Sequence, residues 1–471
     1  MDGGPVHLGA RGEEWLWPPV ETLLGSHDVA GLAVAVVREG EVVSRGFGVR
    51  DVRTGASVTP ETMFHLASVS KPFVATAIVS LASARDAGGP VLDLDAPIVT
   101  WVPELTLADG REREVTARGL LSHSSGLPDV ADYGWHDPQL GDDALSDLAR
   151  SLSGWRLQSE PGSTFSYSNA GFELLGLLLS RVTGTTFEEA VRQQVLAPLG
   201  MRVSTFLRAE VPGHLAASPH VGRPLTVPEG AYPYTRRHAP SSTLHSNLVE
   251  MCRWMEAHLE SAEGARLDPG LLDLVWRPAV PVGDPPWEEA AALGWFVGSY
   301  RGHRTLSHSG ADPGFGSRLV LVPERRTGVV VLANSNTVPT SAIAVAALDV
   351  ALADPALSVA SGATPEELGE GVAAFQRLAA AEQAEHDMDD EELVNAVWGA
   401  IELHRTSLVW PLLRGWTALR PDSSAAWTMT GWAHQVDGHL DLARRLLRRA
   451  LDLDPENDEA ALILRNLPST S

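Results

Sequence analysis

Strand patterns occur at both ends of the first 350 or so residues, with helical patterns between them. Short apolar runs bounded by turn residues predict strands at 31–37, 42–49, 294–300, 304–309, 317–322 and 328–332. Apolar residues spaced three and four apart predict helices at 69–85 and 169–183. The simplest packing is one mostly antiparallel sheet built from both ends, with an inserted helical lobe. The predicted fold class is therefore α/β (α+β), with a site expected in the cleft between sheet and lobe.

The chain changes character after about residue 352. Residues 354–365 have the composition of a linker, and the chain beyond them is helical and without strand patterns. Pro421 and Pro455 stand 34 residues apart (455 minus 421), each after a similar run. Small residues that would let two helices approach closely follow at Gly431, Ala443 and Ala450. This tail resembles the tetratricopeptide repeat, with a generic pair of helical hairpins as the alternative. The predicted domains are residues 1–353, a linker at 354–365 and a helical-repeat domain at 366–471.

Composition excludes several classes of partner. A length of 471 residues predicts two or more domains, and the net charge of -24 disfavours nucleic acid and anionic membranes.

Cys252 is the single cysteine, so it cannot form an intrachain disulfide, and we expect it to be buried in a helix. The amino terminus shows no basic segment followed by an apolar run, so a cytoplasmic location is expected.

Ser68 and Lys71 stand at the predicted start of a helix, in the run Ala-Ser-Val-Ser-Lys-Pro. Positions i and i+3 share a helix face, so the two side chains should meet. A serine hydroxyl needs a nearby base to become a strong nucleophile, and a lysine can serve when burial lowers its pKa. On its own, the pair also fits a capping serine followed by a surface lysine.

Two further patterns carry groups suited to catalysis. Tyr167 could relay protons, and Asn169, two residues later, could hold a substrate amide or orient Lys71. On a late strand, His308 could bind a carboxylate or assist acyl transfer, and Gly310 would let substrate approach the backbone. Taken singly, these patterns also fit a helix-capping loop and an ordinary edge-strand histidine.

The order Ser-x-x-Lys, Tyr-x-Asn and His-x-Gly resembles the serine β-lactamase and penicillin-binding-protein superfamily, in particular its class C branch. The surroundings match as well, in the runs at 64–67, 120–128 and 313–317. The resemblance covers about residues 15–350 and implies a β-lactamase-like fold. That branch includes D-alanyl-D-alanine carboxypeptidases, D-aminopeptidases, carboxylesterases and acyltransferases.

The resemblance implies a role for each residue of the set. Ser68 would be the acylated nucleophile, and Lys71 and Tyr167 would share the general-base and general-acid roles, with their division left open. Asn169 would position the substrate. The backbone N–H groups of Ser68 and Ala311 would form an oxyanion hole.

Two departures from the family pattern stand out. His308 occupies the place where class C β-lactamases carry lysine, which favours peptidase, esterase or acyltransferase activity over β-lactam hydrolysis. At 241–244 the chain reads Ser-Ser-Thr-Leu, where relatives often have a pair of glycines. The sequence indicates no consequence of this second change.

The leading prediction is a serine hydrolase that forms an acyl-enzyme on Ser68 with an ester or amide substrate, either D-peptide-like or a carboxylic ester. An acyltransferase or peptide cyclase is the first alternative, and a scaffold protein acting through the helical tail is the second. No cofactor and no metal are expected, since the 16 histidines include no His-Glu-x-x-His pattern. The expected partners are a small-molecule or peptide substrate and, through the tail, a protein.

Overall fold

A computed structural model describes residues 29–352 and 409–467, except for 87–88, 223–224, 229–231, 261–264, 285–287, 301–302, 336 and 437–438. It also describes a few residues among 16–24 and 390–397. The predicted linker at 354–365 lies outside the described residues.

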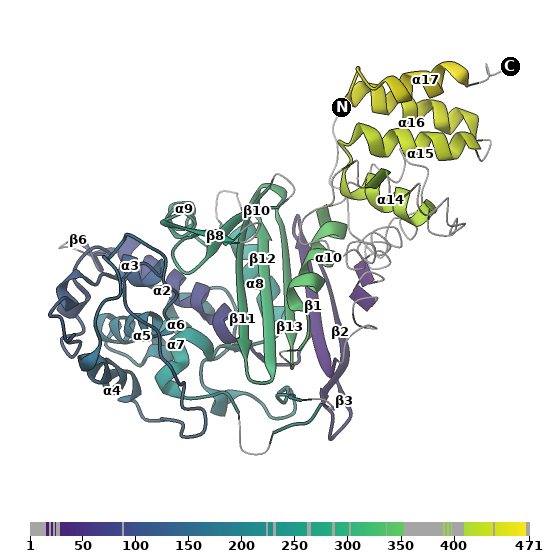
Figure 1. The fold of residues 1–471 in the computed structure, drawn as a ribbon. Coiled ribbons are helices and arrows are strands. Elements are labelled where there is room, and N and C mark those ends of the chain that lie inside the picture. Colours follow the sequence, from purple (N-terminus) through teal and green to yellow (C-terminus); the bar gives the residue numbers. More distant parts are fainter. Residues whose placement is uncertain are drawn as a thin grey trace. The chain divides into compact units, whose positions relative to one another are not determined.

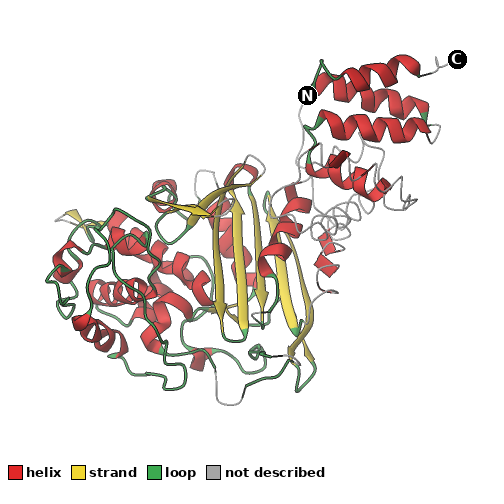
Figure 2. Cartoon of the chain, viewed as in Figure 1, coloured by secondary structure: helices red, strands yellow, loops and turns green. Residues whose placement is uncertain are grey.

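A nine-stranded sheet forms the centre of the first part of the chain (Figures 1 and 2). Its order is β3-β2-β1-β13-β12-β11-β10-β9-β8, and every neighbouring pair is antiparallel. The strands are β1 (Gly31–Arg38), β2 (Glu41–Asp51), β3 (Ala56–Ser57), β8 (Val280–Asp284), β9 (Glu288–Ala291), β10 (Phe296–Tyr300), β11 (His303–Asp312), β12 (Phe315–Val322) and β13 (Thr327–Ala333). Because β1 pairs with β13, strands from both ends of the sequence form one sheet, as predicted.

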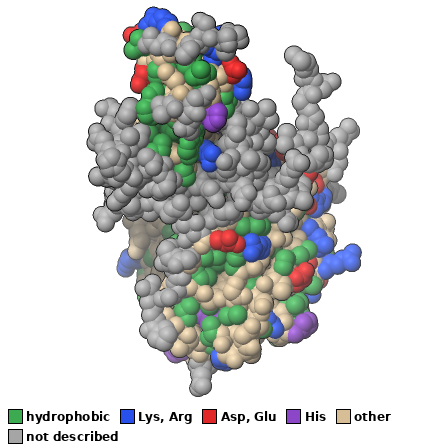
Figure 3. Space-filling model, turned by 90° about the vertical axis from the view of Figure 1, so that its right-hand side faces the viewer, with side chains coloured by type: hydrophobic (Ala, Val, Ile, Leu, Met, Phe, Trp, Pro, Cys, Tyr) green, Lys and Arg blue, Asp and Glu red, His purple; other side chains and the backbone are tan. Residues whose placement is uncertain are grey.

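The central strands are buried along nearly their whole length. All residues of β12 and β13 are buried, which explains why both read as continuous apolar runs. Helix α8 (Leu248–Leu259) packs against β1 and β13, and it contains Cys252, which is buried as predicted. On the face shown in Figure 3, apolar side chains reach the surface between scattered charges.

A helical lobe is inserted between β3 and β8 and lies beside the sheet in Figure 1. Its main helices are α2 (Lys71–Ser83), α3 (Ala117–Leu121), α4 (Ala144–Ser151), α5 (Asn169–Thr183), α6 (Phe187–Val191), α7 (Ala239–Ser242) and α9 (Pro269–Val275). Helix α5 has a clear start and stop. The Ser168 side chain accepts from the Gly171 amide at its amino end, and Gly184 with φ of 69° ends it. The lobe and the sheet share one apolar core.

The described residues from 409 to 467 are largely helical, as predicted. After α10 (Thr340–Leu352), the described helices are α14 (Val409–Leu419), α15 (Ser424–Val436), α16 (Leu440–Leu453) and α17 (Asp458–Asn466). A side chain on Gly431 would put its Cβ 2.9 Å from the Leu447 side chain, so glycine allows α15 and α16 to approach closely. Assignment to the tetratricopeptide repeat stays a prediction.

Contacts divide the chain into two compact units, residues 27–344 and residues 1–26 with 345–471. The predicted boundaries at 353 and 366 stay predictions. Within the described ranges, no helix is long and apolar enough to cross a membrane.

Candidate active site

Ser68 lies in a short 3-10 helix, Ala67–Ser70, that runs directly into α2. Ala67, just before it, has a φ of 48°, a left-handed conformation that costs a non-glycine residue roughly 1–2 kcal/mol. The surrounding structure holds this turn, because Ser317 Oγ on β12 donates to the Leu66 carbonyl at 2.6 Å. Ser68 is thereby fixed, half-buried, at the point where the chain enters the helix.

The neighbouring Ser70 has a structural role. Its side chain is fully buried, and its Oγ accepts a hydrogen bond from the Leu244 amide at 3.0 Å. Ser70 therefore ties the helix start to the segment that follows α7. The hydroxyl that faces Lys71 belongs to Ser68.

Lys71 is fully buried and uses all three of its N–H donors. Its Nζ lies 3.0 Å from Ser68 Oγ, 2.7 Å from Asn169 Oδ1 and 3.0 Å from the Ser241 carbonyl oxygen. Burial lowers the pKa of Lys71 to about 8, although nearby carboxylates, Glu173 first among them, act against this. Lys71 is also the only lysine among the 471 residues. The predicted meeting of Ser68 and Lys71 is present in the structure.

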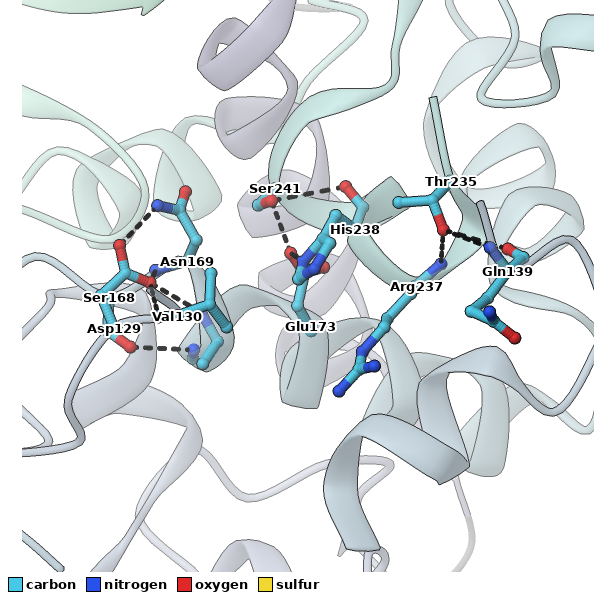
Figure 4. A network of polar contacts seen from close by, with 12 residues as sticks. Asp129, Val130, Gln139, Ser168, Asn169, Glu173, Thr235, Arg237, His238 and Ser241 are labelled. Carbon is cyan, nitrogen blue, oxygen red and sulfur yellow. Dashed lines mark hydrogen bonds and ion pairs between the residues drawn. The ribbon is translucent and has the colours of Figure 1, made fainter. Parts of the chain in front are cut away.

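Asn169 is oriented by a carboxylate that sequence reasoning missed. Asp129 accepts from the Asn169 backbone amide at 2.7 Å and from its Nδ2 at 2.8 Å (Figure 4). Asp129 also accepts from the Ala170 amide at 3.3 Å, so it binds the amino end of α5. With Nδ2 held in this way, the amide oxygen of Asn169 is directed at Lys71.

Tyr167 lies beside the same ammonium group. Lys71 Nζ is 5.0 Å from the centre of the Tyr167 ring, and the ring stacks on His123 with centroids 4.1 Å apart. Burial raises the pKa of Tyr167, and a hydrogen bond with Ser68 acts in the opposite direction. The phenol is therefore protonated at neutral pH, which is the form that can donate a proton.

Strand β11 presents an edge next to Ser68. Its pairing with β10 covers residues 303–307, while its pairing with β12 continues to Asp312. A side chain on Gly310 would put its Cβ 3.0 Å from the Ser68 amide nitrogen and 2.5 Å from the Leu66 carbonyl oxygen. Only glycine allows this approach. Ala311 follows on the same edge, beyond the residues of β11 that pair with β10.

His308 is neutral, with one donor and one acceptor nitrogen on its ring. It is 1% exposed, and burial together with the Lys71 ammonium lowers its pKa to about 3. Its Nδ1 donates to the Ser309 carbonyl at 2.7 Å, which leaves Nε2 as the acceptor. Within the described part of the chain, Nε2 has no hydrogen-bond partner. This acceptor atom is itself buried in the structure.

The structure brings together all the predicted side chains of the set, and it adds three carboxylates around Lys71. These are Asp129, Glu173 and Asp312. Asp312 Oδ2 lies 2.7 Å from His65 Nε2. Of the three, only Glu173 has a local signal in the sequence, because it stands four residues after Asn169 and so shares its helix face.

The family model described as "Beta-lactamase" matches residues 20–353. The chain belongs to this family. The predicted superfamily and β-lactamase-like fold are confirmed.

Two relatives and one solved structure illustrate the similarity of this Beta-lactamase family member to known proteins. Protein flp of Staphylococcus aureus (strain MW2) is 26% identical over 327 residues, which are 68% of this chain but only 62% of flp. Penicillin-binding protein 4 of Amycolatopsis lactamdurans is 28% identical over 67% of this chain and 83% of its own. The octameric penicillin-binding protein homologue from Pyrococcus abyssi has a TM-score of 0.62 and 26% identity, with 74% of this chain and 78% of the homologue covered.

Proposed function

We propose that this enzyme hydrolyses esters or amides through an acyl-enzyme on Ser68. The observation that carries the proposal is the 3.0 Å contact between Lys71 Nζ and Ser68 Oγ, made by a fully buried lysine whose pKa is lowered to about 8. Once neutral, Lys71 can still donate to Asn169 and to the Ser241 carbonyl while its lone pair accepts the Ser68 proton.

The same geometry supports a two-step reaction. Ser68 Oγ bonds to the substrate carbonyl carbon as its proton passes to Lys71, and the bond to the leaving group breaks as that group receives a proton. Tyr167, protonated at neutral pH, is the proposed donor or relay for that proton. The amides of Ser68 and Ala311 are proposed to bind the oxyanion. Water then attacks the acyl-enzyme, releases the acid and restores Ser68.

The proposed substrates are small molecules or peptides with a D-peptide-like amide or a carboxylic ester. Two observations support this class. The edge of β11 beyond residue 307 can pair with an extended peptide or amide. The relative from Amycolatopsis lactamdurans is a penicillin-binding protein by name, and penicillin is a cyclic amide.

A substrate panel tests the proposal. The purified protein is incubated with nitrophenyl esters, with D- and L-alanine nitroanilides and with nitrocefin, each with and without hydroxylamine as acceptor. Release of the free acid without acceptor supports hydrolysis. Product that forms only with the acceptor would show acyl transfer instead. Absence of turnover on every substrate, together with an unlabelled Ser68 after fluorophosphonate treatment, would contradict both.

A further inference from the structure

A buried carboxylate, Glu173, lies beside the site and has no part in the reaction proposed above. It is on α5, one turn beyond Asn169, and it is 0% exposed. Its Oε1 accepts from Ser241 Oγ at 2.5 Å and lies 3.0 Å from His238 Nδ1. Figure 4 shows the Ser241 and His238 side chains converging on it. A carboxylate removed from water in this way is costly unless nearby charge compensates it.

Ser241 connects this carboxylate to Lys71. Its hydroxyl donates to Glu173, while its backbone carbonyl accepts from Lys71 Nζ at 3.0 Å. Ser241 belongs to the single short turn of α7, so a constraint on its side chain also constrains its carbonyl. A glycine at this position would lack the hydroxyl that Glu173 binds. A single residue, Ser241, therefore links Glu173 to Lys71, whose ammonium group faces Ser68.

Three carboxylates act on Lys71, and Glu173 has the largest effect. Glu173, Asp312 and Asp129 all raise the pKa of Lys71 against the effect of burial. Asp129 and Asp312 are only half-buried, whereas Glu173 is fully buried. Water and salt therefore screen the Glu173 charge least.

The other titratable side chains around the pair are His123, His308, Tyr133 and Tyr167. Burial lowers the pKa of both histidines and raises the pKa of both tyrosines, so all four are neutral at pH 7. His238 contacts Glu173 directly from the 3-10 helix Arg236–His238, so its own proton must be controlled in any test.

We propose that Glu173 is a positioning residue for acylation, whose negative charge balances the Lys71 ammonium and whose bond to Ser241 holds that residue's carbonyl at Lys71 Nζ. The proposal rests on the proposed function, in which Lys71 exchanges a proton with Ser68. It explains why a charged group lies deep in the core with no contact to the substrate edge of β11.

The unique lysine makes a direct test possible. In protein labelled with ¹³C at the lysine ε carbon, the one side-chain signal reports Lys71 alone. We expect Glu173→Gln, which keeps the shape but removes the charge, to lower the titration midpoint of this signal by roughly one pH unit or more. The acidic limb of kcat/KM on a small ester should move down by the same amount. The shift should persist in a His238→Asn background, which keeps an N–H donor but does not titrate.

Two matched variants separate charge from packing. Glu250, on α8, is also buried and also accepts from a serine hydroxyl, Ser204 Oγ, at 2.5 Å. Glu250→Gln should leave the Lys71 midpoint in place. Ser241→Ala keeps the Glu173 charge, so it should slow acylation while the midpoint changes little.

An unchanged midpoint in folded Glu173→Gln would overturn the proposal, as would an equal shift in Ser241→Ala. If Glu173→Gln does not fold, the apolar variant Glu173→Met with Ser241→Ala and His238→Phe removes the carboxylate together with both side chains that contact it, and it should show the same lowered midpoint. The signal reports Lys71 whether or not the enzyme turns over. A failure of the proposed function, seen as an unlabelled Ser68, is thereby distinguished from a failure of the role given to Glu173.

Discussion

Asn169 Nδ2 donates to Asp129 at 2.8 Å, and this bond turns the amide oxygen of Asn169 toward Lys71. Asp129 also accepts from two backbone amides at the start of α5. The Asp129 side chain thus caps α5 and also orients the Asn169 amide.

Substitution of Asp129 by alanine should therefore affect both stability and rate. Loss of the cap should reduce the free energy of unfolding by about 0.5–2 kcal/mol. Freed from Asp129, Asn169 should hold Lys71 less well, and kcat on a small ester should fall by about 10–100-fold. Denaturant unfolding and steady-state kinetics check the two effects. The control is Asp132→Ala on the same loop; the Asp132 carboxylate is exposed and, among the described residues, accepts only from the Gly134 amide. Equal rates in the two variants would contradict the role given to Asp129.

The pH dependence of the reaction should follow Lys71. Only the neutral amine accepts the Ser68 proton, and the Lys71 pKa is about 8, so kcat/KM should rise with pH through a midpoint near that value. His123 and His308, whose pKa values are lowered, should add no step between about pH 6 and 9. The Lys71→Arg variant stays charged at this position, so its kcat/KM should fall by about 10³-fold or more. A profile that is flat from about pH 7 to 9 would speak against Lys71 as the base.

Gly310 should tolerate no side chain. In Gly310→Ala the new Cβ would lie 2.4 Å from Ser317 Oγ and 2.5 Å from the Leu66 carbonyl, so the backbone beside Ser68 must move. We expect the free energy of unfolding to fall by about 1–3 kcal/mol. The rate on a small ester should fall by more than this loss of stability explains, because the moved backbone adjoins Ser68. The control is Gly154→Ala, where the added Cβ meets no described residue within 4 Å other than its immediate neighbours along the chain. Similar thermal unfolding and similar rates for both variants would rule out the close approach.

The helical tail is predicted to serve recognition rather than chemistry. All the groups placed at the site precede residue 345, where the contacts divide the chain. Expression of residues 1–360 alone should give a protein that folds and acts on small esters, with loss only on the native substrate or partner. A fragment that is folded by circular dichroism but inactive on small esters would show that the tail helps to build the site.

The central strands could be predicted because burial on both faces produces continuous apolar runs, as in β12 and β13. Strands β8 and β9 were missed because Val-Pro-Val-Gly-Asp and Glu-Glu-Ala-Ala carry neither alternation nor an apolar run. β8 is the edge strand of the sheet and β9 is next to it, where less apolar surface is required.

The site, like the fold, has contacts that the sequence predicts and contacts that it does not. Helical spacing predicts the contact of Ser68 with Lys71, because both lie within one turn. The contacts of Lys71 with Asn169 and with the Ser241 carbonyl join segments 98 and 170 residues away, so only the fold brings them together. Every residue has a backbone carbonyl, so the residue type at 241 does not predict the contact with Lys71. The unusual Ser-Ser pair was visible at 241–242, but its hydrogen bond to Glu173 was not.

Covalent labelling tests the central claim most directly. The protein is treated with a fluorophosphonate probe and with penicillin, digested, and the modified peptide is sequenced by mass spectrometry. The account predicts one label, on Ser68, and none in Ser68→Ala, whose ester hydrolysis should fall by several orders of magnitude. A label on Ser70, or activity and labelling that survive in Ser68→Ala, would contradict it.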